Sequence, residues 1–125
     1  MYIQDDLKEC LKLQYRGISY KVNEEKGVVV ALAYFRTPLS MEAGANQCIN
    51  TIGIARLNKS AGDTFNIEVG KKIARAKAEK EAFTQFRTML LNYEKKVFQA
   101  RLNIAEAIIT MSSHIEHQKE YIKSF

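Results

Sequence analysis

Glycine and proline are absent from the last 55 residues of this 125-residue chain. All six glycines and the only proline, Pro38, lie within the first seventy residues. Because these two residues most often interrupt regular structure, their absence from the second part of the chain indicates helix there. Their presence in the first part is typical of strands joined by turns. We therefore expect an α+β fold in a single domain, residues 1–125, with a β-rich part at 1–62 and a helical part at 63–125.

Cysteine is scarce, and long apolar runs are missing. Cys10 and Cys48 lie far apart, and neither belongs to a C-x-x-C arrangement, so neither a disulfide framework nor a zinc cluster is indicated. No apolar run approaches the roughly 18 residues that a membrane span requires. The first ten residues have acids where a signal peptide would have cations and an apolar core, so we expect a cytoplasmic protein.

Motifs of catalysis are missing as well. His114 and His117 lie one helical turn apart beside Glu116, but no third metal ligand of good type is near them. Neither histidine has an evident serine or cysteine partner, and the KSAGD stretch at 59–63 lacks the spacing of a P-loop. We therefore expect no catalytic residue, no metal and no cofactor, and a protein that is not an enzyme.

The first part of the chain has the pattern of a short helix followed by three antiparallel strands. The predicted elements are a helix over 3–14, strands over 18–22, 28–35 and 49–57, and a turn at Glu24–Gly27. Gly53, inside the third strand, indicates a bulge or the close approach of another backbone. The stretch Thr37–Cys48 is predicted to be a long loop.

The second part begins with a helix N-terminus. Asn66 is the predicted N-cap, and Glu68 complements the helix dipole in the first turn. From Phe83 onward, apolar residues recur in steps of three and four, as in a coiled coil. We expect this helix to break where Ser113 and Glu116 form a capping box for a last helix over 114–124, or alternatively near Asn92.

The length of the helical part predicts an oligomer. A single helix over 67–111 would run roughly 65 Å, whereas a compact monomer of this size is only about 35 Å across. The helix must therefore fold back on itself or pair with another chain, since three short strands cannot cover its apolar stripe. We expect a homo-oligomer, in the simplest form a two-fold dimer whose seam is formed by these long helices.

Positive charge is concentrated on the helix. Nine cations and three acids lie between Lys71 and Arg101, a local surplus of six that exceeds the whole-chain value of +5. Such a cluster suits a phosphate or nucleic-acid surface, or only a solvated helix face. GKKIARAKAEKEAF, over 70–83, also resembles the last helix of a double-stranded-RNA-binding domain. Here, however, some forty residues follow that helix, and the hairpin turn lacks that module's histidine.

Phe83 and Arg87 form the most suggestive pair in the sequence. They are four residues apart and so share one helix face. An aromatic ring beside a guanidinium suits a nucleotide, because the ring can stack on the base while the guanidinium binds phosphate oxygens. The alternative is that Phe83 only contributes to the apolar seam.

The layout TIGIARLN…DTFNIEVGKKIARAKAEKEAF resembles small phage proteins of the Thoeris anti-defence sponge family, first type, most closely over residues 49–101. The resemblance implies an antiparallel sheet followed by long dimerising helices. It also implies non-catalytic sequestration of the cyclic ADP-ribose isomers made by TIR-domain immune proteins in the bacterial host cytoplasm. Some members of that family hold cyclic oligonucleotides at a separate site. The alternative is a basic homodimer that binds nucleic acid of the double-stranded-RNA type.

The resemblance also implies ligand contacts at Arg56, Phe83, Asn92 and Arg101. Phe83 would stack on adenine, Asn92 would read the base edge or a ribose hydroxyl, and the arginines would neutralise the pyrophosphate. Around Arg101 the register leaves Arg87, Lys95 and Lys96 as competitors. Phe83 and Asn92 face opposite ways on a straight helix, so a shared pocket requires two protomers or a break between them. A second site, if present, is expected at Arg36 and the loop that follows it, Thr37–Cys48.

Overall fold

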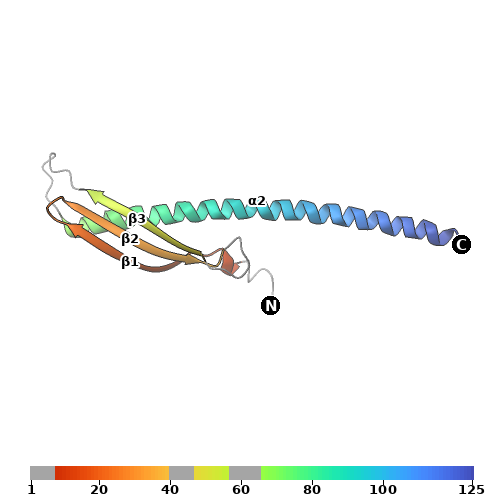
Figure 1. Ribbon diagram of the computed structural model, residues 1–125, viewed down its shortest axis with the longest axis horizontal. Helices are drawn as coiled ribbons and strands as arrows, with labels where there is room; N and C mark the ends of the chain where they lie inside the picture. Colours follow the sequence, from red (N-terminus) through yellow and green to blue (C-terminus); the bar gives the residue numbers. More distant parts are fainter. Residues whose placement is uncertain (1–7, 40–46, 57–65) are drawn as a thin grey trace. The chain divides into compact units, whose positions relative to one another are not determined.

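The computed structural model describes residues 8–39, 47–56 and 66–125 and has the expected α+β architecture. After a helical turn at residues 8–10 come three strands and one long helix. These elements are β1 (Gln14–Asn23), β2 (Val28–Thr37), β3 (Gln47–Arg56) and α2 (Ile67–Lys123) (Figure 1). The helix predicted over 3–14 was too long at its end, since the helical turn stops at residue 10 and Gln14 already belongs to β1; residues 3–7 lie outside the described part.

The chain forms two compact units, residues 1–90 and 91–125. The first unit contains the sheet and the beginning of α2, and the second contains the remainder of α2. The boundary between the two units falls within α2. Within the described ranges, no helix combines the length and apolarity of a bilayer-spanning segment.

The sheet is antiparallel throughout, in the order β1-β2-β3. The turn between β1 and β2 follows its local sequence: the Lys26 amide donates to the Asn23 side-chain oxygen at 3.0 Å, and the Gly27 amide donates to the Glu24 carbonyl at 3.2 Å. Gly27 has a φ of 64°, a conformation that glycine adopts without a steric penalty. The predicted turn at Glu24–Gly27 is thus confirmed.

Helix α2 begins where the sequence predicts. Asn66 is its N-cap, because its side-chain oxygen accepts a hydrogen bond from the Val69 amide at 3.2 Å and its carbonyl accepts one from Gly70 at 2.9 Å. Glu68 occupies the first turn, next to the positive end of the helix dipole.

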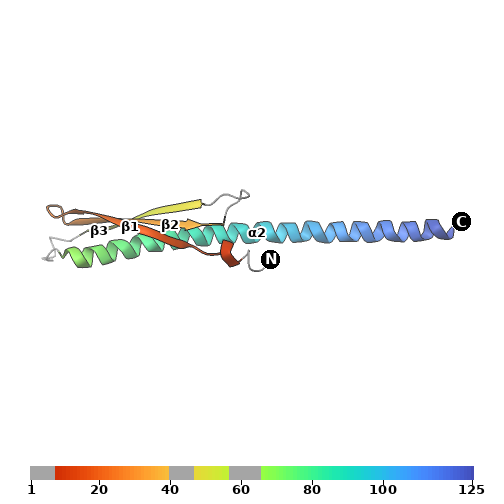
Figure 2. The same cartoon turned by 90° about the horizontal axis from the view of Figure 1, so that it is seen from below.

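The beginning of α2 lies along one side of the sheet (Figure 2). Its buried residues lie four residues apart and are Gly70, Ala74, Ala78, Ala82 and Phe86. They lie against what we call the inner face of the sheet, whose buried members on β2 and β3 are Val29, Ala31, Ala33, Phe35, Thr37, Ile49, Thr51, Gly53 and Ala55. The other side of the sheet is called the outer face below.

The helix and the sheet touch through their backbones at Gly53. A Cβ atom at this position would overlap the Ala74 carbonyl and the Ala78 amide of α2. Beside it, the Thr51 hydroxyl donates to the Ala78 carbonyl at 2.6 Å. The predicted close approach of another backbone at Gly53 is therefore confirmed, and that backbone is α2.

The predicted break in the helix was wrong. α2 is continuous from Ile67 to Lys123, through both Asn92 and Ser113. No glycine or proline follows Gly70, and a serine can lie inside a helix at a small cost in propensity. The apolar series predicted from Phe83 onward does not form one continuous buried face at its start. Phe86 is buried against the sheet, but Phe83 is exposed.

Candidate functional site

Phe83 projects from α2 as an exposed ring on an aromatic support. Its ring meets the buried Phe35 edge-on, with centroids 6.0 Å apart, and Phe35 in turn meets Tyr15 at 5.8 Å. Phe83 itself remains 55% exposed. The edge contact holds the ring in place and leaves much of its surface for another group to cover.

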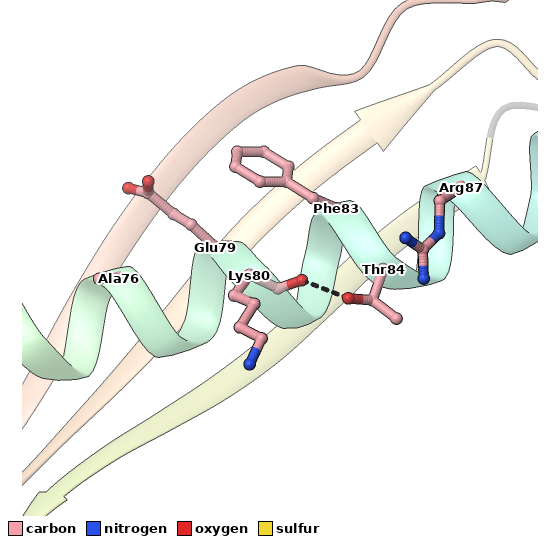
Figure 3. Close-up of a pocket in the computed structure, with 6 residues that line it drawn as sticks. All are labelled: Ala76, Glu79, Lys80, Phe83, Thr84 and Arg87. Carbon is pink, nitrogen blue, oxygen red and sulfur yellow. Dashed lines mark hydrogen bonds between the residues drawn. The ribbon is translucent and has the colours of Figure 1, made fainter.

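A depression of about 500 Å³ surrounds Phe83 (Figure 3). Every residue that lines it belongs to α2: Ala76, Glu79, Lys80, Phe83, Thr84 and Arg87. The Thr84 hydroxyl donates to the Lys80 carbonyl at 2.8 Å, so its hydrogen is already used. Because a single helix supplies the whole lining, the depression is open, and a second surface would be needed to enclose a ligand there.

The charges of this wall suit an anion. Glu79 accepts a hydrogen bond from Nε of Arg75 at 2.6 Å, and this bond raises the pKa of the Arg75 guanidinium above its ordinary value. The Glu79 carboxylate is therefore compensated. Lys80 and Arg87 form no ion pair with any described residue, so their charges are available to a ligand.

Other cations of the helix start are used within the protein. The Lys71 ammonium lies 5.4 Å from the centroid of the Tyr20 ring, and the Arg75 guanidinium lies 5.5 Å from that of Tyr15. Lys77 reaches β3 and donates to the Ile54 carbonyl at 2.9 Å. Three of the nine cations of the basic cluster thus hold α2 on the sheet.

Arg56 lies away from Phe83 within one chain. Phe83 contacts Phe35, whereas Arg56 pairs with Val28 near the other end of β2. Phe35 and Val28 are separated by about 23 Å along β2, at 3.3 Å per residue. Arg56 also belongs to the outer face of the sheet. A single chain therefore does not gather both residues into one site.

The remaining predicted contacts are exposed. Asn92 and Arg101 belong to the second unit of the chain, and no helix break occurs between Phe83 and Asn92. Arg36 is exposed on the outer face of β2, but residues 40–46 of the loop that follows it lie outside the described part. Among the predicted residues, Phe83 and Arg87 line the depression described above.

Lys80 is the lining residue that sequence reasoning overlooked. It precedes Phe83 by three residues, a spacing that places both on one helix face and could have identified it. Phe35 could not be identified in this way, because its contact with Phe83 depends on how α2 lies on the sheet.

No protein-family model, curated protein or solved structure matches this chain.

Proposed function

We propose that this protein binds and sequesters a small cyclic nucleotide signal without transforming it. The observation that carries the proposal is the exposed Phe83 ring, held edge-on by Phe35, with Arg87 one helical turn further along and Lys80 one turn before it. A planar base would stack on the free ring surface, which contributes about 1–3 kcal/mol per base. The two cations would bind phosphate oxygens, and arginine can do so with two parallel hydrogen bonds.

The ligand class follows from combining this wall with the resemblance of residues 49–101. A cyclic ADP-ribose isomer offers an adenine to stack and a pyrophosphate to neutralise. The proposed activity is therefore the removal of the signal that TIR-domain immune proteins make in the bacterial cytoplasm, which would counteract anti-phage defence. Tight binding with slow release is what sequestration needs, because no turnover has to follow.

A second copy of the chain would supply the missing wall. Large apolar side chains in the second unit are exposed, including Ile108 at 61%. One series recurs in steps of three, four or seven residues, and we call it the coiled-coil stripe: Val97, Ile104, Ile108, Met111, Ile115 and Ile122. Such a series pairs with its like in coiled coils, so we propose a homodimer along this stripe. Asn92 and Arg101 of the partner copy are the proposed additional ligand contacts.

Capture and release tests the proposal. The purified protein is mixed with the product of an active TIR-domain protein and filtered, and the retained fraction is heat-denatured and examined by mass spectrometry. Intact cyclic ADP-ribose isomer in that fraction supports sequestration. If the signal stays in the filtrate, the proposal is wrong for this ligand; if only a cleaved product is released, the protein is catalytic. Tyr121→Ala, which removes an exposed aromatic residue far along α2, is the matched control for Phe83→Ala.

The alternative function, a nucleic-acid-binding homodimer, rests on the lysine-rich helix start and the basic pI of about 9.2. The contacts of Lys71, Arg75 and Lys77 with the sheet unit leave fewer cations for a phosphate backbone, which favours the small ligand. Nucleic-acid binding would weaken steeply with added salt and show little preference among small nucleotides. A salt titration with duplex RNA separates the two proposals.

A further inference from the structure

Glu79 is the one acid among the described residues that line the depression around Phe83. Its side chain is 29% exposed, whereas the glutamate side chains of the other described ion pairs are 65% to 74% exposed. Nε of Arg75 donates to Oε1 of Glu79 at 2.6 Å, and the Arg75 guanidinium itself lies over the Tyr15 ring. The Glu79 carboxylate is therefore held at the edge of the depression by a partner that is anchored on the sheet.

One oxygen of this carboxylate remains available to a ligand. Oε1 accepts the hydrogen bond from Arg75, and Oε2 accepts none from the residues that the structure describes. Because Arg75 compensates the negative charge, Glu79 does not cancel the attraction of Lys80 and Arg87 for an anion. The depression thus combines two unpaired cations with one open hydrogen-bond acceptor.

The acceptor and the arginine lie on opposite sides of the aromatic ring. Glu79, Phe83 and Arg87 follow one another at intervals of four residues, so they share one side of α2. Figure 3 shows Phe83 between the other two along the helix. The Cα atoms of Glu79 and Arg87 are about 12 Å apart along the helix axis. A group stacked on Phe83 therefore has an acceptor at one end and a cation at the other.

An adenine nucleotide has the matching polarity. Its sugar and phosphates extend from the five-membered ring of the base, and the amino group at position 6 lies on the six-membered ring, away from them. This amino group donates hydrogen bonds, and bonds to a charged acceptor are the strong ones. Hypoxanthine has nearly the same shape but a carbonyl oxygen at position 6, which a carboxylate oxygen repels. A carboxylate at this place therefore distinguishes the two bases.

We propose that Glu79 determines the base specificity of this site by accepting a hydrogen bond from the amino group of an adenine stacked on Phe83. This inference rests on the proposed function, because it assigns a further residue to the same site. It also fixes the direction in which the nucleotide lies, with the base edge at Glu79 and the phosphates toward Arg87 and Lys80. Asn92 of a partner copy would then contact a ribose hydroxyl.

A comparison of two ligands tests the proposal. The first is the cyclic ADP-ribose isomer made by an active TIR-domain protein, and the second is its counterpart with hypoxanthine in place of adenine. Isothermal titration of the wild-type protein should show that the adenine compound binds at least about tenfold more tightly, as expected for one hydrogen bond to a charged group. Equal affinities for the two compounds would overturn the proposal.

Glu79→Gln tests the role of the residue itself. The glutamine oxygen can still accept the bond from Arg75, so the amide NH₂ group takes the place of Oε2 and donates toward the base. The preference for adenine should therefore disappear and turn toward hypoxanthine. Glu81→Gln is the matched control, since it removes the same charge from an exposed side chain that does not line the depression, and it should keep the wild-type ratio of affinities. A Glu79→Gln protein that still prefers adenine tenfold would refute the assignment.

The same titrations distinguish this inference from the proposed function. If wild-type protein binds neither compound, sequestration of this ligand is wrong, and the role of Glu79 is wrong with it. If it binds both with equal affinity, sequestration stands and only the role of Glu79 is overturned. Phe83→Ala should weaken both compounds by the same factor, because stacking on the ring does not depend on the group at position 6.

Discussion

Gly53 of β3 lies directly against the Ala74 carbonyl of α2, with no room for a side chain between the strand and the helix. Two backbones approach this closely only where one position lacks a Cβ atom. The line of glycine and alanine on α2 serves the same purpose on the helix side, and the long helix is thereby held on the sheet at a defined position.

Gly53→Ala should therefore be strongly destabilising. The added methyl group would overlap backbone atoms, which cannot move aside as a flexible side chain can, so we expect a loss of about 3 kcal/mol or more in the free energy of unfolding. Urea denaturation measures it. Asn50→Ala, on the exposed face of the same strand, is the control and should change stability by less than about 0.5 kcal/mol. A fully stable Gly53→Ala protein would contradict the described packing.

Thr51→Val should cost about 1 kcal/mol of unfolding free energy. The hydroxyl of Thr51 is buried and donates to the Ala78 carbonyl at 2.6 Å, and valine replaces it with a methyl group of similar volume. Thr51→Ser retains the donor, although it loses the methyl group. Comparing the two by thermal or urea denaturation separates the hydrogen bond from the packing; equal stability of Thr51→Val and wild type would show that the bond contributes little.

Phe83→Ala should weaken binding of a cyclic ADP-ribose isomer by about 1–3 kcal/mol, which is roughly 5- to 150-fold. Arg87→Lys should also weaken it, since lysine keeps the charge but loses the paired hydrogen bonds to phosphate. Isothermal titration measures both. Because Phe83 and Arg87 are exposed, the melting temperature without ligand should change little. Unchanged affinity in both variants would move the site away from this depression.

Ile108→Asp combined with Ile115→Asp should disrupt the proposed dimer. Both residues are exposed in the single chain, so the substitution does not touch its core, but it places charges in the coiled-coil stripe. Light scattering after size exclusion should show a shift to monomer, with a loss of helix signal in the circular dichroism spectrum. Gln99→Asp, outside the coiled-coil stripe, should leave the mass unchanged. A dimer that survives the double substitution would have to be held by another surface.

Local features of this protein were determined by the sequence alone. The turn at Glu24–Gly27 and the N-cap at Asn66 each depend on side chains and backbone within a few residues, so their chemistry can be recognised without knowing the rest of the fold. The absence of glycine and proline after residue 70 likewise predicts a long helix. The expected break at Ser113 failed because a capping pattern ends a helix only where the preceding residues leave the helical conformation, and nothing here compels them to.

Only the tertiary structure decided which side of the helix meets the sheet. The spacing of Phe83 and Phe86 is compatible with either ring lying in the core. A prediction from hydrophobic spacing also gives most weight to large apolar residues. The sheet instead receives a line of small residues that ends in Phe86, because close contact between backbones excludes bulky side chains at Gly53. Phe83 is consequently left at the side, supported by Phe35 and open to a ligand. The exposure of Phe83 follows from the close approach of the α2 backbone to the β3 backbone at Gly53. The spacing of residues along one helix cannot predict that distance.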